Sequence, residues 1–594
     1  MPTYTAPLRD MRFVMFDLLG TEAELRTLPA FEGVDRDTID AVLEEAARFA
    51  STVAQPLNAI GDIDGCKIDA EGNVTTPPGF RDAYRQFGDA GWPALSCDPA
   101  FGGQGLPVII NNRMYEMLNS ANQAWLMYSG LSHSAYECLV AFGNEEQKRV
   151  YLPKLVSGEW SGTMCLTEAQ CGTDLGMIKT RAEPTGDGAF ALTGTKIFIS
   201  AGEHDCSENI LHLVLARLPD APAGTRGISL FLVPKFIPDA DGAVGARNTI
   251  RAASLEHKMG IHGNATCVMN LDSARGWLIG EPHKGLAAMF VMMNSARLGV
   301  GMQSLGLAEM ATQNAVAYAK DRLQGRAATG AVLPEKAADP IIVHPDVRRM
   351  LFTCKAYTEG GRALATWVAQ LTDRAHAHPD AAVRSESEEL ITLLTPVVKA
   401  CLTDNGFETC NLALQVLGGH GFIREWGMEQ LVRDARINMI YEGTNGIQAL
   451  DLLGRKVLHD RGARLGMLRK LVGSFLDAEA GDARMAEFVA PLRSLDAELA
   501  AVSVEIATHV QADPDTLGAA ATPYLRLLGH YTYAWLWARM AKLSLDADAA
   551  DGFHSAKLAT ARFYFTRLLP ESGQCLAAIR SGPGTLMALD ASAF

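Results

Sequence analysis

Residues 433–448 read RDARINMIYEGTNGIQ, and they place an acid, Glu442, between an apolar run and a glycine-rich break. A carboxylate held in such a place can be shielded from water, which raises its pKa and suits it to act as a general base. The same pattern also fits a solvated acid in a turn. The spacing alone leaves both interpretations open.

Two earlier stretches combine hydroxyl groups with turn and strand patterns. Residues 165–174 read CLTEAQCGTD, and successive backbone N–H groups in such a turn can bind an anion; a purely structural turn is the alternative. Residues 192–202 read LTGTKIFISAG and predict a strand. Phe198 and Ser200 are two positions apart in it, so we expect them to share one face.

Length and composition describe a folded globular chain. Its 594 residues suggest roughly four domain-sized units, and it is 48% hydrophobic and 20% charged. The net charge of −15 argues against a nucleic-acid-binding protein. The 11 cysteines include no CxxC pair, no secretory signal opens the chain, and no run of 18 apolar residues occurs. We therefore expect a cytoplasmic protein with no membrane span.

The hydrophobic period divides the chain into four parts. We expect an N-terminal helical domain over 1–157, a middle β domain over 158–282, a helical bundle over 283–458 and an additional C-terminal helical domain over 459–594. Alternating apolar residues predict strands over 190–192, 196–200, 211–216 and 227–233. Helical spacing predicts helices over 38–56, 80–90, 108–142, 286–323, 345–371, 385–417, 490–512, 523–545 and 555–569.

Several familiar site patterns fail. Residues 62–66, DIDGC, lack the ligands of a calcium loop and predict a turn. The glycines at 299 and 301 lie inside a helical pattern, which does not suit a dinucleotide fingerprint. The histidines show no metal-ligand spacing, so no metal site is expected.

A collinear series of motifs makes residues 91–456 resemble the acyl-CoA dehydrogenase family. The series is GNEEQK at 143–148, LTE…GTD at 166–174, GTKIFIS at 194–200, KMGI at 258–261, RLQG at 322–325, QVLGG at 415–419 and RDARI…IYEGT at 433–444. The resemblance implies a mainly α fold, with a helical domain, a middle β-barrel or sandwich and a helical bundle. The additional C-terminal helical domain would follow these.

The resemblance also implies an FAD-dependent α,β-dehydrogenation of an acyl-CoA thioester. Glu442 matches the base that takes the α-proton, and flavin N5 receives the β-hydride. A carboxylate is too weak a base for an unactivated thioester, so the carbonyl must be polarised. In the family, the backbone N–H of the base residue and a flavin ribityl hydroxyl do this.

Site residues follow from the same resemblance. The cofactor-binding residues it implies are Met164, Leu166, Thr167, Gly172, Thr173, Phe198, Ile199, Ser200, Arg322, Gln324, Gln415, Gly419 and Thr444. The substrate-binding residues it implies are Thr173, Asn294, Arg297, Tyr441 and Gly443. Arg322, Gln415 and Gly419 match groups that hold the AMP end of a neighbouring subunit's FAD, which implies a homodimer or homotetramer.

Several positions depart from the family pattern, among them Gln170-Cys171 in place of the usual small or proline-containing turn and Gly325 where a phenylalanine is usual. Phe198 stands where Trp is usual, Asn294 where Asp is usual, His262 where Arg is common, and Gly446 where a Gln often helps to hold FAD.

The extra length resembles a long bacterial group within the family. That group includes enzymes of dimethylsulfoniopropionate degradation that oxidise 3-(methylthio)propanoyl-CoA to 3-(methylthio)acryloyl-CoA and pass electrons to electron-transfer flavoprotein. We expect that substrate and that partner here. A general short- or medium-chain acyl-CoA dehydrogenase and an acyl-CoA oxidase are the alternatives. A DNA-binding relative without dehydrogenase activity is disfavoured by Glu442 and by the net charge.

Overall fold

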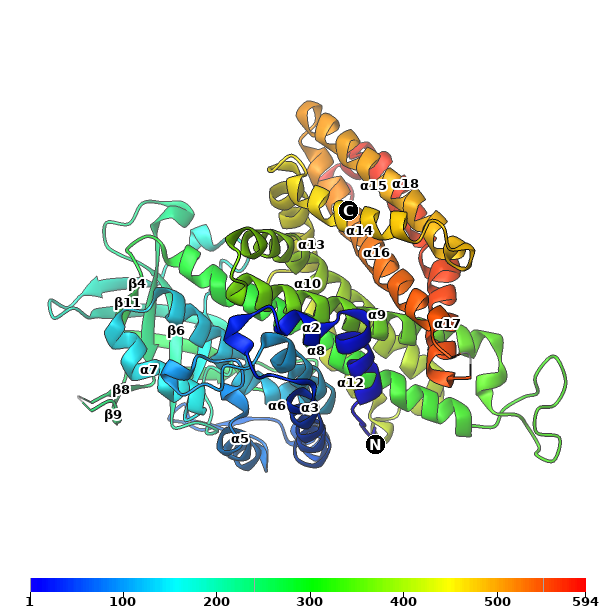
Figure 1. Cartoon of the computed structure of the whole chain (residues 1–594). Coiled ribbons are helices and arrows are strands. Elements are labelled where there is room, and N and C mark those ends of the chain that lie inside the picture. The colour runs from blue at the N-terminus through cyan, green and yellow to red at the C-terminus, as the bar shows by residue number, and fades with distance from the viewer. Residues whose placement is uncertain (1, 240, 549) are drawn as a thin grey trace. The chain divides into compact units, whose positions relative to one another are not determined.

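A computed structural model describes residues 2–239, 241–548 and 550–594 (Figure 1). Its internal contacts divide the chain into two compact units. The helical unit comprises Met1–Glu44, Val108–Glu116 and Val300–Phe594. The mixed unit comprises Glu45–Pro107 and Met117–Gly299. Each unit is described by itself.

The mixed unit contains a seven-stranded sheet and two short strand pairs. The seven strands are β3 Trp160–Cys165, β4 Arg181–Pro184, β5 Phe190–Ser200, β6 Asn209–Arg217, β7 Ile228–Pro234, β10 Ile250–Leu255 and β11 Thr266–Ile279. The short pairs are β1 Lys67–Ile68 with β2 Val74–Thr75, and β8 Phe236–Pro238 with β9 Val244–Arg247. The alternating stretches of the sequence thus form strands, as predicted.

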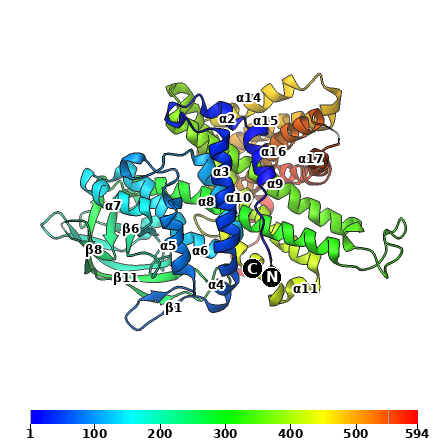
Figure 2. The same cartoon turned by 60° about the horizontal axis from the view of Figure 1, so that its bottom comes forward.

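Pairing closes the large sheet into a barrel. β11 pairs β5, β5 pairs β4, β4 pairs β6, β6 pairs β7, and β7 returns to β11. β10 adds to β11, and β3 adds to β6. Figure 2 shows β6 and β11 of this sheet. β7 is apolar along most of its length and buried at every position, as expected of a strand covered on both faces.

A bulge interrupts β5 where the sequence predicts regular alternation. Cys267 of β11 pairs Ile199, whereas Met269 pairs Lys196, so two residues of β5 oppose one of β11. Phe198 adopts a φ of 60°, and its side chain is 61% exposed. The bulge therefore breaks the strand alternation from which we expected Phe198 and Ser200 to share one face.

Helices make up most of the remaining described residues. In chain order they are α1 Leu8–Arg12, α2 Thr21–Leu25, α3 Arg36–Phe49, α4 Asn58–Asp64, α5 Phe80–Asp89, α6 Val108–Phe142, α7 Glu145–Ser157, α8 Gly285–Asp321, α9 Pro345–Ala377, α10 Ala381–Leu417, α11 Gly419–Phe422, α12 Met428–Arg436, α13 Asn445–Leu450, α14 Ala463–Ala478, α15 Ala486–Ala512, α16 Asp515–Asp546, α17 Gly552–Phe563, α18 Glu571–Arg580 and α19 Gly584–Met587. Local signals set several ends. Asn144 and Gln147 form a capping box at the start of α7, and Pro345 occupies the first position of α9.

Among the residues that the structure describes, one helix meets the length and composition of a membrane span. α8 is long and apolar enough, although half of its most apolar window is buried within the structure. The sequence expectation of no span rested on an unbroken apolar run, whereas α8 qualifies on its average hydropathy. A buried core helix passes the same test.

The C-terminal helices pack into the helical unit around α16 (Figure 1). α16 contacts α9, α10 and α13. Trp537 of α16 donates from Nε1 to the backbone oxygen of Ala356, 3.2 Å away. A Cβ on Gly360 would lie 2.7 Å from Trp537 Nε1, so the glycine of α9 permits this close approach. The C-terminal helices are thus an integral layer of the unit.

A charge cluster lies inside the same unit. Its acids are Asp10, Glu116, Glu309 and Glu359, and its bases are Arg113, Lys355, Arg362 and Lys557. Equal numbers of acids and bases keep it neutral. Lys557 is 1% exposed and pairs with Asp10 and with Glu359, the latter at 2.7 Å. The cluster therefore joins the N-terminal segment, α6, α8, α9 and α17.

Candidate active site

The candidate base lies in a strained turn between α12 and α13. Glu442 has a φ of 56°, and Gly443 has a φ of 81°. A left-handed conformation costs a non-glycine residue about 1–2 kcal/mol. Glu442 is partly buried and is therefore neither a fully solvated turn acid nor a core carboxylate. Such strain is concentrated at functional sites.

The chain entering the turn is anchored by Tyr441. Its single hydroxyl hydrogen is shared between two acceptors, Gln303 Oε1 of α8 and Asn438 Oδ1, the latter 2.9 Å away. Asn438 in turn donates to Ser304 Oγ at 2.9 Å and is fully buried. The residue before Glu442 is thus fixed to α8.

The chain leaving the turn is anchored by α13. Thr444 caps this helix by accepting a hydrogen bond from the Ile447 backbone N–H. Asn445 donates to Asp404 Oδ1 at 2.6 Å and accepts from Lys399 Nζ at 2.9 Å, both on α10.

A second contact on that side reaches back over the turn. Gln448 donates from Nε2 to the backbone oxygens of Glu442, at 3.1 Å, and Gly443, at 3.3 Å. The sequence interpretation missed Asn445 and Gln448, although both lie in the quoted stretch.

The predicted flavin-facing residues of the mixed unit lie at one edge of the barrel. The Ile197 backbone N–H donates to the Thr167 oxygen at 2.9 Å, which places the segment after β3 beside β5. Thr163 Oγ1 donates to the Ser200 oxygen at 2.7 Å. The structure therefore brings Met164, Leu166 and Thr167 together with Phe198, Ile199 and Ser200. The exposed aromatic ring of Phe198 fits a flat ring system such as isoalloxazine.

A buried ion pair that the sequence interpretation missed shapes this edge. Lys196 donates to Glu168 Oε1 at 2.8 Å and to the Leu166 oxygen at 3.0 Å. Glu168 also accepts from the backbone N–H groups of Lys179 and Thr180. Burial opposes ionisation of Glu168, but the charge of Lys196 and these hydrogen bonds lower its pKa to about 2. The sequence signal for this ion pair was a charged residue, Lys196, within a predicted strand.

The turn after β3 is closed by its own backbone. Glu168 and Cys171 exchange two backbone hydrogen bonds of 2.9 Å. The backbone N–H groups of Glu168 and Cys171 therefore serve the turn itself and do not face an anion. Gly172 and Thr173 follow the turn and are exposed.

The predicted AMP-end residues are exposed in the helical unit. Arg322 and Gln324 lie at the neck of an inserted loop, where Gln324 N–H donates to the Asp339 oxygen at 2.9 Å. Gln415 lies in the last turn of α10, and Gly419 begins α11. The Tyr318 hydroxyl and His420 Nδ1, 2.9 Å apart, join the end of α8 to α11.

The predicted substrate-side residues are divided between the units. Asn294 and Arg297 lie one turn apart on α8, and Arg297 donates to Asn294 Oδ1 at 3.2 Å. With Thr173 they belong to the mixed unit, whereas Tyr441 and Gly443 belong to the helical unit.

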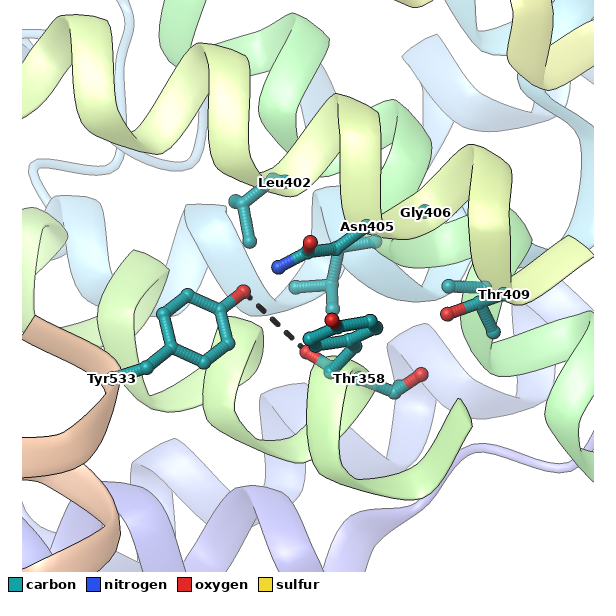
Figure 3. Close-up of a pocket in the computed structure, with 9 residues that line it drawn as sticks. Thr358, Leu402, Asn405, Gly406, Thr409 and Tyr533 are labelled. Carbon is teal, nitrogen blue, oxygen red and sulfur yellow. Dashed lines mark hydrogen bonds between the residues drawn. The ribbon is translucent and has the colours of Figure 1, made fainter. Parts of the chain in front are cut away.

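A small cavity in the helical unit lies apart from these residues. Thr358, Leu402, Asn405, Thr409 and Tyr533 contribute to its walls (Figure 3). The Tyr533 hydroxyl donates to the Tyr357 backbone oxygen at 3.5 Å. None of the predicted site residues lines it.

Residues 62–66 differ from the predicted turn. Asp62, Ile63 and Asp64 are the last residues of α4, and Gly65 follows with a φ of 59°. Within the described parts of the chain, no group of three or more His, Cys, Asp or Glu side chains is arranged to hold a metal ion.

Comparison with protein families matches nearly the whole chain. Residues 36–159 match "Acyl-CoA dehydrogenase, N-terminal domain", and residues 163–274 match "Acyl-CoA dehydrogenase, middle domain". Residues 283–458 match "Acyl-CoA dehydrogenase, C-terminal domain", and residues 468–590 match "Acetyl-CoA dehydrogenase C-terminal like".

Individual relatives extend over the full length. A 3-methylmercaptopropionyl-CoA dehydrogenase of Ruegeria pomeroyi is 42% identical over 96% of both chains. A broad-specificity linear acyl-CoA dehydrogenase of Mycobacterium tuberculosis is 34% identical over 100% of both. The solved structure of Caenorhabditis elegans ACDH-11 in complex with C11-CoA has the same fold, with a TM-score of 0.78 at 19% identity over 95% of this chain and 91% of that one. The chain therefore belongs to the acyl-CoA dehydrogenase family of FAD-dependent oxidoreductases.

Proposed function

We propose that this chain catalyses α,β-dehydrogenation of 3-(methylthio)propanoyl-CoA, with Glu442 as the base that removes the α-proton. The observation that carries the base assignment is the left-handed turn at Glu442, which is anchored on both sides. The 42% identity to a 3-methylmercaptopropionyl-CoA dehydrogenase over nearly the whole length supports the substrate.

The residues of the mixed unit fit FAD. Phe198 presents an exposed ring, and the backbone of Thr167 lies against the same strand; the hydroxyls of Thr167 and Ser200 would suit the polar edge of a flavin. When bound, FAD supplies the acceptor for the hydride that leaves the β-carbon. We propose that Arg322, Gln324, Gln415, Gly419 and Thr444 bind the remainder of the cofactor.

The side chain and the backbone of Glu442 have separate roles in α-proton removal. The carboxylate takes the α-proton, and the backbone N–H of the same residue donates a hydrogen bond to the thioester oxygen as negative charge develops there. The left-handed φ directs this N–H and the side chain differently from a helical residue. Asn294 and Arg297 are proposed to contact the substrate from α8.

Replacing the base tests the assignment. We expect Glu442→Gln to retain FAD and to lose dehydrogenation by about 10³-fold or more, because no other group would take the α-proton. Glu388→Gln, at an exposed position of α10, is the matched control and should stay within about twofold of wild type. Near-normal turnover of Glu442→Gln would overturn the assignment.

A pair of substrates of similar shape tests the acyl group. Pentanoyl-CoA has a CH₂ where 3-(methylthio)propanoyl-CoA has sulfur, so their lengths are nearly matched. We expect kcat/KM to be at least about tenfold higher for the methylthio substrate, within the range that one group contributes in an apolar pocket. Equal values, or a preference for pentanoyl-CoA, would support a general acyl-CoA dehydrogenase.

The electron acceptor and the assembly are part of the proposal. We propose electron-transfer flavoprotein as the partner and a homodimer as the assembly. Rapid turnover with oxygen alone would instead identify an oxidase. Light scattering of the FAD-loaded protein measures the number of copies.

A further inference from the structure

We propose that Gln448 is a positioning residue that holds Glu442 in its left-handed conformation, with Asn445 as the second support of the turn. The proposal rests on the proposed role of Glu442 as the base. Gln448 and Asn445 are each assigned to the turn, and neither is proposed to touch the substrate.

Gln448 contacts the turn at the residues with unusual backbone angles. Its Nε2 donates to the carbonyl oxygens of Glu442, at 3.1 Å, and Gly443, at 3.3 Å. These two residues have φ values of 56° and 81°. If either returned to an extended or helical conformation, its carbonyl would turn away from Gln448. The two hydrogen bonds therefore favour the left-handed pair.

The orientation of the Gln448 amide is determined by its surroundings. Nε2 faces two carbonyl oxygens, and exchanging it with Oε1 would set three oxygens against one another. Gln448 is fully buried, and its Oε1 has no hydrogen-bond partner among the described residues. An unpaired buried acceptor is unfavourable. The Gln448 side chain thus leaves Oε1 without a hydrogen bond while Nε2 donates to the two carbonyl oxygens of the turn.

Asn445 ties the same turn to a long helix. Its Nδ2 donates to Asp404 Oδ1 at 2.6 Å and to Thr403 Oγ1 at 3.0 Å, and its Oδ1 accepts from Lys399 Nζ at 2.9 Å. Lys399 and Thr403 are fully buried on α10. α10 therefore provides a fixed reference for the start of α13, from which Gln448 reaches back.

Positioning predicts a defect in proton abstraction with little change in binding. A displacement of about 1 Å at a reacting group can cost on the order of 100-fold in rate. We expect Gln448→Met, which keeps the volume and removes the donor, to lower kcat by about 10–100-fold and to change KM less than threefold. The kinetic isotope effect on flavin reduction with C2-deuterated acyl-CoA should increase, because α-proton removal becomes slower.

Gln370→Met is the matched control. Gln370 is also buried in the helical unit, and its Nε2 donates to the backbone oxygen of Leu19 at 3.3 Å. The two variants remove similar hydrogen bonds, but only one of these bonds reaches the turn. We expect Gln370→Met to retain the wild-type kcat per bound FAD and the wild-type isotope effect.

Asn445→Ala provides an independent measurement if Gln448→Met does not fold. It should lower kcat by about 3–10-fold and raise the same isotope effect. A wild-type kcat and isotope effect in the folded Gln448→Met variant would overturn the proposal, as would a wild-type isotope effect in Asn445→Ala. Retained activity in Glu442→Gln would instead refute the base assignment, so the two failures are distinguishable.

Discussion

The buried Lys557 allows a quantitative test of how the C-terminal helices are held. We consider Lys557→Met, which keeps much of the side-chain volume and removes the charge. Lys557 is 1% exposed and pairs with Asp10 and Glu359. The variant leaves the charge cluster with one uncompensated negative charge.

The pKa of Asp10 gives the magnitude. Burial opposes its ionisation, but the charges of Lys557 and Arg362 outweigh burial and lower the pKa from 3.8 to about 2. That difference corresponds to about 2.4 kcal/mol of stability at neutral pH. Removing one partner of a buried ion pair costs about 3–5 kcal/mol. Because Asp10 keeps Arg362, we expect a loss of about 2–4 kcal/mol.

The sign of the pH dependence follows from the lowered pKa. The contribution of Asp10 is fully present above pH 3.8 and is lost as the pH falls from 3.8 through about 2. The stability difference between wild type and variant should therefore be constant from pH 7 to pH 5 and shrink at lower pH.

Urea unfolding followed by far-UV circular dichroism measures the loss. Lys470→Met, at an exposed position of α14, is the matched control and should change the unfolding midpoint very little. A Lys557→Met protein as stable as wild type at pH 7 would refute the reasoning, because the charge cluster would then contribute no net stability.

Two further perturbations test other contacts of the helical unit. Gly529→Ala on α16 should destabilise the protein by about 1–3 kcal/mol, because the new Cβ would collide with Cys401 Sγ. Gly518→Ala on the same helix places its Cβ near no other atom and should stabilise the protein by up to about 1 kcal/mol. Equal effects of the two variants in urea unfolding would contradict this packing. Burial raises the pKa of Asp373 to about 7, although the backbone N–H groups of Ile109 and Val108 donate to it, so its contribution to stability is present below about pH 4 and lost as the pH rises through 7. Asp373→Asn should remove this pH dependence, so the variant should gain stability relative to wild type between pH 4 and 7, by at most about 1.4 kcal/mol per pH unit. A stability difference between variant and wild type that does not change with pH would contradict the raised pKa of Asp373.

Local patterns predicted most elements of the fold. The apolar period of residues 80–90 corresponds to α5, and Asp513 and Pro514 separate α15 from α16 as a helix break should. One break was hidden. Asn122 leaves the helical region inside α6, with φ of −164° and ψ of 89°, and accepts a hydrogen bond from the Trp125 backbone N–H. Asn122 lies in the polar stretch NSANQ at 119–123, but apolar residues continue on both sides of it, so periodicity missed the break.

Long-range features could not be predicted in this way. Asp10 and Lys557 look like surface charges in their local sequence, and only the tertiary structure buries them together. The quoted stretch indicated Glu442 but not its left-handed backbone, because the contacts that hold it come from the side chain of Gln448. The motif thus identifies the turn, and the packing determines its conformation.

The composition of the helical unit has a consequence for protein synthesis. Arg539 donates to the backbone oxygen of Leu18 at 2.6 Å, and 521 residues separate the two. At about 5–20 residues per second, the ribosome needs roughly 25–100 s to make that intervening chain. During this time the apolar residues Phe13, Val14 and Met15, which are buried in the finished protein, have no C-terminal helices to pack against. These residues are therefore synthesised long before the helices that bury them, and their native contacts form only after residue 539 has been added.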